Sequence, residues 1–295
     1  MKMNKFAAGK PACPVACKYC FITEHETRRE VWNMNPVAGI NKACTFINVT
    51  PWIDVDEEEH DRFAGFDWSL LAGDYVGFTA ITDPFYPRID RWLWEWLENA
   101  SQVAKLTTCV TKWGISRKVM ARLATYPNFF LVLGITGNFS IERTPLKSHL
   151  NTLALAREYG VPCLPISHPY IAGLSDLSFL PQVKALGYDY FDVKGLRYCD
   201  TNMGAWMPEA SKSYYIGSDD EVLPEDGWRQ LVADAGLQLL SPRQWYVREA
   251  QLRNLSPQLS LAEAQAKVDA VMALANVVTS GSYEQVRDAA IARRL

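Results

Sequence analysis

The sequence predicts an α/β fold in which strands and helices alternate along a parallel sheet. Short apolar runs recur roughly every 25 residues between residues 75 and 194, and amphipathic helical patterns fill the intervals. Pro and Gly stand at the ends of these helical segments. Such alternation is typical of right-handed βαβ units, so an open barrel of six units is the favoured architecture. A doubly wound sheet stays open as the alternative, since both arrangements place ligands at the carboxyl ends of the strands.

The individual elements follow from local patterns. Apolar runs predict strands at 75–81, 104–110, 129–135, 161–167 and 188–194. The intervals predict helices at 90–99, 115–125, 145–160 and 177–186, of which the last two end at Gly160 and Gly187. The prolines of the fourth strand suit its ends better than its middle. A short strand before Cys13 would complete the six.

The rest of the chain departs from this alternation. Residues 199–222 are rich in Met, Trp, Tyr, Gly and Ser and predict a long loop. The pattern after residue 223 is mainly helical, with helices expected at 261–275 and 283–294. We therefore expect a barrel with an N-terminal loop over residues 1–198, followed by an active-site loop and a helical extension over residues 199–295.

Composition narrows the classes of function. The chain has 295 residues, 48% of them hydrophobic, which is enough for a large core. Its net charge is −3 and it has no Lys/Arg block, which counts against a nucleic-acid backbone as partner. No apolar run could span a membrane, and the N-terminus lacks an apolar signal region. The odd number of cysteines, seven, fits a reducing compartment, so a cytoplasmic location is expected.

Residues 13–21, CPVACKYCF, hold three cysteines in the spacing C-x3-C-x2-C: Cys13, Cys17 and Cys20. A structural zinc site would need a fourth ligand, for which His25 is the nearest candidate. A redox or packing role is a second reading. The third is a [4Fe–4S] cluster held by three thiolates, which leaves one iron open to a ligand.

With an aromatic residue, Tyr19, before its last cysteine, this motif resembles the signature of the radical SAM superfamily. The resemblance implies a partial (β/α)6 barrel and a [4Fe–4S] cluster at the three cysteines. It also implies S-adenosylmethionine bound to the open iron through its amino and carboxylate groups. One electron, from an external donor of the flavodoxin or ferredoxin type, would then yield a 5′-deoxyadenosyl radical.

Four further stretches resemble the branch of that superfamily that contains spore photoproduct lyase. They are TDPFYP (82–87), TKW (111–113), ERTPLKSHL (142–150) and HPYIAGLSD (168–176), each beside a predicted strand or helix end. Their order and spacing carry the resemblance, which covers about residues 10–195.

The resemblance implies a set of contacts to S-adenosylmethionine. They are Thr82 and Asp83 with its amino group, Lys112 and Arg143 with its carboxylate, Thr136 and Asn138 with its ribose, and Tyr19 and Phe21 beside the adenine or the cluster. Thr82 and Asp83 also suit a turn that begins a helix, and Lys112 also suits a solvated surface.

One departure bears on the reaction. The lyase has a cysteine just before its Thr-Ser-Asp stretch, and that thiol supplies a hydrogen atom, whereas Ala80 and Ile81 stand here. Cys199, beside Tyr198 at the end of the last predicted strand, is the alternative hydrogen donor. A buried free cysteine is also a common small hydrophobe.

The acidic pI, the loop at 199–215 rich in Met and aromatic residues and the short chain permit a lyase-type radical enzyme that acts on a ribosomally made precursor peptide. The resemblance implies the splicease type of reaction, which excises a tyrosine-derived fragment by carbon–carbon cleavage and leaves a ketoamide. A small separate recognition protein would present the peptide, because no peptide-binding winged helix is evident after residue 223. Nucleic-acid repair of the photoproduct lyase kind is the alternative, and a non-catalytic iron–sulfur or zinc protein is a third possibility.

Overall fold

The structure is a computed structural model that describes residues 17–20, 37–41, 44–47, 68–72, 75–78, 83–85, 90–197, 206–215 and 221–252. Its strands are β1 (Val37–Asn41), β2 (Cys44–Ile47), β3 (Tyr75–Phe78), β4 (Leu106–Thr111), β5 (Phe129–Gly134), β6 (Cys163–Ser167), β7 (Tyr190–Val193), β8 (Leu196–Arg197), β9 (Glu221–Val222) and β10 (Gln238–Leu239). Its helices are the 3₁₀ turn η1 (Trp68–Leu71), α4 (Asp90–Val103), α5 (Arg117–Leu123), α6 (Leu146–Tyr159), α7 (Leu180–Ala185), α8 (Glu209–Tyr215), α9 (Trp228–Asp234) and α10 (Pro242–Leu252).

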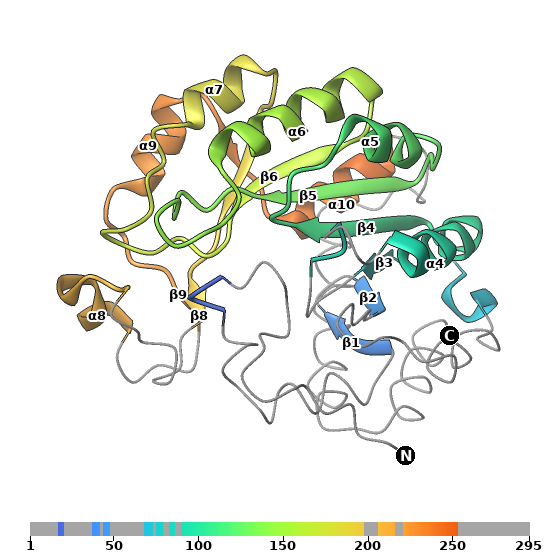
Figure 1. The fold of residues 1–295 in the computed structure, drawn as a ribbon, viewed down its shortest axis with the longest axis horizontal. Helices are drawn as coiled ribbons and strands as arrows, with labels where there is room; N and C mark the ends of the chain where they lie inside the picture. Colours follow the sequence, from blue (N-terminus) through green and yellow to red (C-terminus); the bar gives the residue numbers. More distant parts are fainter. Residues whose placement is uncertain are drawn as a thin grey trace.

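The main sheet keeps its strands in chain order. The order is β1-β2-β3-β4-β5-β6-β7-β10, with β1 antiparallel to β2 and every later pair parallel. Helices α4, α5, α6, α7 and α9 cover one face, and α10 lies on the other (Figure 1). A doubly wound sheet requires a reversal of strand order, and the described strands have none. The α/β class with a parallel sheet is therefore confirmed, in the sequential order that a partial barrel needs.

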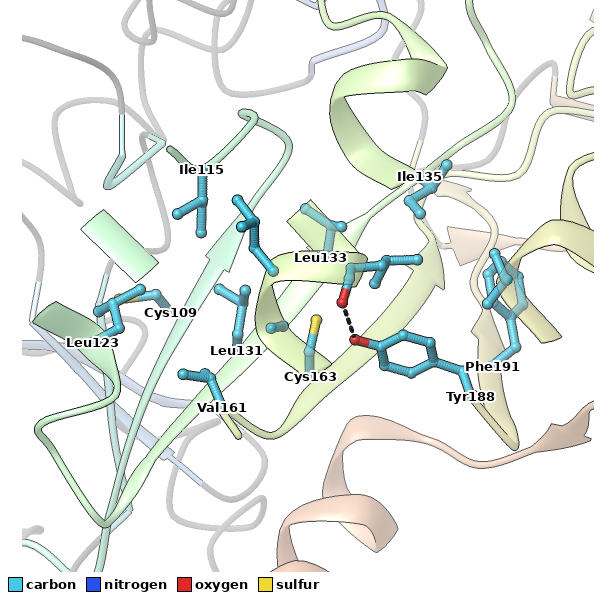
Figure 2. Packing of buried hydrophobic residues seen from close by; sticks show 14 of the residues in the cluster. Cys109, Ile115, Leu123, Leu131, Leu133, Ile135, Val161, Cys163, Tyr188 and Phe191 are labelled. Atoms are coloured by element: carbon cyan, nitrogen blue, oxygen red, sulfur yellow. Dashed lines mark hydrogen bonds between the residues drawn. The ribbon is translucent and has the colours of Figure 1, made fainter. Parts of the chain in front are cut away.

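Alternation along β5 illustrates how the two faces of the sheet are built. Leu131 and Leu133 pack beneath the helices, within the cluster that Figure 2 shows. Phe130 and Val132 point to the opposite face, where the Phe130 ring lies 5.4 Å from the ring of Trp245 in α10. Successive side chains of a strand point to opposite faces, so a continuous apolar run is what a strand covered on both sides requires.

The helix that follows β5 ends where the sequence places its glycine. Gly160 has φ of 69°, and its N–H bonds back to the carbonyl oxygens of Ala156 and Arg157. This left-handed conformation has no steric cost for glycine, which is why the residue ends α6. The Tyr188 hydroxyl then donates to the Leu153 carbonyl oxygen at 2.8 Å, joining α6 to the segment that leads into β7 (Figure 2).

Most of the predicted elements are confirmed, with ends that differ by a few residues. The five predicted strands correspond to β3 to β7 and the four predicted helices to α4 to α7. Pro165 is an exception to the expectation for prolines, because it lies in the middle of β6. Its missing N–H is tolerated there because β6 pairs with β7 only from Ile166 onward.

The prediction of a long loop over residues 199–222 is wrong in part. Helix α8 lies within it, and β9 pairs with β8 at its end. A seven-residue helix has too few turns for a periodic signal, and α8 is held by tertiary contacts such as the fully buried Tyr215. Strands β1, β2 and β10 were not predicted either. The strand expected before Cys13 and the helices expected at 261–275 and 283–294 lie outside the described residues.

Candidate functional site

Polar side chains gather where neighbouring strands of the main sheet end. Lys112 directly follows β4 and His168 directly follows β6. Asp83 and Asn138 lie a few residues beyond β3 and β5. Because parallel strands end at the same edge, these residues share the carboxyl edge of the sheet, where ligands bind in such folds.

The turn Cys17–Cys20 packs against this edge. Its backbone closes through a hydrogen bond from the Cys20 amide to the Cys17 carbonyl oxygen at 3.0 Å. Cys17 and Tyr19 are buried. Around them lies an apolar wall drawn from loops far apart in the sequence, made of Trp113, Ile141, Ile171, Leu174, Leu196, Trp206, Met207, Tyr215 and Val222.

Lys112 and Glu142 join the cysteine turn to the strand ends. The Lys112 Nζ lies 3.7 Å from Glu142 Oε1 and 5.2 Å from the centre of the Tyr19 ring. It also donates to the carbonyl oxygen of His168, and the Tyr19 hydroxyl donates to Glu142 Oε1. Burial, and then the charge of Glu142, raise the pKa of Tyr19 well above its usual value, so the phenol keeps the proton that it donates. The structure thus brings Tyr19 and Lys112 together, and their contact with a shared ligand stays a prediction.

Glycine at the end of β5 makes room for Lys112. A Cβ built on Gly134 would lie 3.0 Å from Lys112 Cγ and 3.5 Å from its Nζ. Such contacts are tight, so a larger residue would push the lysine side chain away. Gly134 is visible in the sequence, but glycine occurs at strand ends for several reasons. Its presence alone therefore does not indicate that a lysine side chain packs against it.

Asp83 is buried, and its carboxylate is fully engaged by the chain itself. Oδ1 accepts from the Thr111 hydroxyl at 2.7 Å and the Phe85 amide at 3.1 Å. Oδ2 accepts from the amides of Lys112 at 2.7 Å and Trp113 at 3.1 Å. Burial raises the pKa of Asp83, and these four donors oppose that shift. Asp83 therefore fixes the backbone from which Lys112 projects.

Thr136 and Asn138 are fully buried within the loop that follows β5. Thr136 Oγ1 accepts from the Asn138 amide at 3.1 Å, and Asn138 Nδ2 donates to the Pro169 carbonyl oxygen at 3.1 Å. Asn138 Oδ1 accepts from the Ser175 hydroxyl at 2.8 Å. These bonds tie the loop after β5 to the loop after β6. The contact of Thr136 and Asn138 with a ribose stays a prediction.

His149, which was not predicted as a site residue, contacts the backbone of Lys112. It is fully buried on α6, and its Nε2 lies 2.9 Å from the Lys112 carbonyl oxygen. Since a carbonyl oxygen only accepts, Nε2 carries the proton and Nδ1 carries the lone pair. Burial lowers the pKa of His149, which keeps the ring neutral.

Cys17 and Cys20 are the described members of the motif that would hold an iron–sulfur cluster. Burial raises the pKa of Cys17 to about 12, and the charge of Lys112 opposes the shift. The charge of Glu142 adds to the shift, so Lys112 compensates a thiolate only in part. Cys20 lies in the same turn and supplies a second thiol of the type that holds iron–sulfur clusters, and binding of a cluster stays a prediction. Among the described residues no group of three or more Cys, His, Asp or Glu could hold a metal, and Cys13 lies outside them.

Among the remaining predicted site residues, only Arg143 is described. It follows Glu142 and is exposed, and its contact with a ligand stays a prediction. The positions outside the described residues are Cys13, Phe21, Thr82, Tyr198 and Cys199, together with Ala80, Ile81 and His25. Glu142 was missed as a site residue although it begins the stretch ERTPLKSHL. The sequence cannot show that the cysteine turn folds back over it.

Comparison with known proteins adds no family. No protein-family model matches the chain, and no curated protein matches it significantly.

Among the described helices, none has the length and apolar character needed to cross a membrane.

Proposed function

We propose that the protein is a radical S-adenosylmethionine enzyme built on a partial (β/α)6 barrel. The observation that carries the proposal is the position of the turn Cys17–Cys20, which packs at the carboxyl edge of the sheet beside Lys112. The C-x3-C-x2-C spacing, the sequential parallel strands and the helices on one face of the sheet support it.

Cys13, Cys17 and Cys20 would hold a [4Fe–4S] cluster with one open iron. When bound, the cluster and S-adenosylmethionine supply a 5′-deoxyadenosyl radical for hydrogen abstraction. The chain supplies binding and orientation. Lys112 offers a cation to the carboxylate of S-adenosylmethionine, Tyr19 places an aromatic ring against that cation, and Asp83 fixes the backbone of Lys112.

A precursor peptide is the proposed substrate, with carbon–carbon cleavage as the reaction. The apolar wall beside the cysteine turn includes the partly buried Trp113 and Trp206, whose exposed parts suit an aromatic or aliphatic side chain. A net charge of −3 does not favour the phosphates of a nucleic acid. Cys199 would supply or take the hydrogen atom, beside Tyr198.

The proposal is tested by the release of 5′-deoxyadenosine. We expect anaerobically reconstituted protein, given dithionite and S-adenosylmethionine, to form 5′-deoxyadenosine, and Cys17→Ala to form none. Cys163→Ala, which removes a thiol buried in the sheet, is the matched control and should retain the activity. Product formation by Cys17→Ala, or none by the wild type, would contradict the proposal.

The substrate is tested by mass spectrometry. A precursor peptide encoded beside this gene, co-expressed with the protein and any small neighbouring partner, should lose the mass of the excised fragment. Cys199→Ala should retain cleavage of S-adenosylmethionine but alter the peptide product. An unchanged peptide combined with modification of an oligonucleotide would favour nucleic-acid repair instead.

A further inference from the structure

Two buried carboxylates, those of Asp83 and Glu142, lie at the carboxyl edge of the sheet. They differ in how many of their oxygens can still accept a hydrogen bond from a ligand. Asp83 is 5% exposed, and both of its oxygens already accept two hydrogen bonds from the chain. A carboxylate has about four acceptor positions in all, so Asp83 has none to spare.

The side chain of Glu142 is 2% exposed, and only one of its oxygens is engaged. Oε1 accepts from the Tyr19 hydroxyl and faces the Lys112 Nζ at 3.7 Å. Oε2 is buried without a hydrogen-bond partner in the described part of the chain. Leaving a buried acceptor of this kind unpaired is unfavourable, and more so when it carries charge, so such an atom calls for a donor.

Further acceptor capacity lies close by in the sequence. His149 Nδ1 and Thr144 Oγ1 are also buried without a hydrogen-bond partner among the described residues. The charge of Glu142 acts on His149, so the two side chains lie within electrostatic range of each other. Glu142 Oε2 and the lone pair of His149 Nδ1 are thus acceptors without a donor among the described residues, whereas the Thr144 hydroxyl can both donate and accept. An ammonium group provides three donors.

We propose that Glu142 Oε2 accepts a hydrogen bond from the ammonium group of a ligand that carries an α-amino carboxylate, while Lys112 faces its carboxylate. The anion and cation stand side by side and complement the two charges of such a zwitterion. This inference rests on the proposed function, in which the ligand is S-adenosylmethionine. It gives to Glu142 the ammonium contact that the sequence suggested for Thr82 and Asp83.

The test is anaerobic equilibrium dialysis of S-adenosylmethionine and of its analogue without the amino group, each against reconstituted protein. Glu142→Gln keeps an oxygen for Tyr19 but places an amide N–H₂ where Oε2 was. We expect the variant to weaken binding of S-adenosylmethionine at least about tenfold, because the amide N–H₂ and the ammonium group of the ligand are both donors and cannot bond to each other. Binding of the deaminated analogue should not fall, and iron content should stay at the wild-type level.

Glu158→Gln is the matched control, since Glu158 lies on α6, the helix that follows Glu142, but is exposed and paired with Arg117. It should bind both ligands as the wild type does. Equal binding of S-adenosylmethionine by Glu142→Gln and wild type would overturn the inference while leaving the proposed function intact. A wild-type protein that binds neither ligand would overturn the proposed function itself.

A second variant keeps the inference testable if Glu142→Gln does not fold. Glu142→Asp retains the charge but shortens the reach, so the preference for S-adenosylmethionine over its deaminated analogue should shrink. An unchanged preference in Glu142→Asp, or no preference in the wild type, would show that Glu142 does not contact the ammonium group.

Discussion

Two pairs of cysteines lie in regions of the molecule that treat a thiol differently. Cys109 and Cys163 are buried within β4 and β6, inside the hydrophobic core between the sheet and the helices. Cys17 and Cys20 lie in a turn at the carboxyl edge, against an apolar wall and beside Lys112. The first pair belongs to strands that the sequence predicts well, and the second to a loop whose position it cannot show.

The difference lies in the charges around each thiol. Burial raises the pKa of Cys109, and the charge of Asp83 raises it further. Burial also raises the pKa of Cys17 and the charge of Glu142 adds to the shift, but there the charge of Lys112 opposes it. A core thiol thus has every reason to stay protonated, whereas the turn provides a cation that can stabilise thiolate ligands. Burial alone therefore does not separate a packing cysteine from a ligand.

The largest expected effect is on metal content. Cys17→Ala and Cys20→Ala should each abolish uptake of iron and sulfide in anaerobic reconstitution, because a cluster with three protein ligands cannot lose one. Elemental analysis measures both elements. Cys109→Ala should take up as much iron as the wild type, and a loss of iron there would break the distinction between the two regions.

A smaller effect is expected on stability at the carboxyl edge. Asp83→Ala should lower the free energy of unfolding by about 3 kcal/mol or more, because four buried donors lose a charged acceptor. Chemical denaturation followed by circular dichroism measures the change. Asp176→Ala is the control, since its exposed carboxylate accepts from the Ser178 amide at 2.8 Å and its loss should cost much less. Equal losses in the two variants would contradict the structural role of Asp83.

The smallest effect is expected in the core. Tyr188→Phe should lower the free energy of unfolding by about 1 kcal/mol, since it removes one buried hydrogen bond to the Leu153 carbonyl oxygen and leaves the ring in place. Iron content should not change. Tyr159→Phe serves as control, because that hydroxyl accepts from the exposed Arg117 and should matter less. A loss of iron in Tyr188→Phe would mean that core and edge are coupled.

The sequence predicts the sheet better than it predicts the site. Strands β3 to β7 are continuous apolar runs, and α6 ends at Gly160, because burial on two faces and a left-handed cap each leave a direct trace in residue type. Strand β10 has two residues and α8 has seven, so tertiary contacts rather than periodicity define them.

Lys112 was predicted at the site from the resemblance of TKW (111–113) to the photoproduct lyase branch, and its position directly after β4 is the edge where ligands bind in parallel sheets. The saturation of Asp83 and the unpaired oxygen of Glu142 were not predicted. Both depend on which donors other segments bring to the carboxylate, and a linear pattern does not contain that information. For Asp83 the sequence suggested a ligand, whereas its hydrogen bonds give it a role in holding the chain.

The central claim is that the turn Cys17–Cys20 holds an iron–sulfur cluster to which S-adenosylmethionine binds. Electron paramagnetic resonance of the reconstituted, dithionite-reduced protein tests it most directly. The account predicts the signal of a reduced [4Fe–4S] cluster, absent in Cys17→Ala, and a change in that signal when S-adenosylmethionine is added. A wild-type protein with no such signal, or a signal that saturating S-adenosylmethionine leaves unchanged, would contradict it.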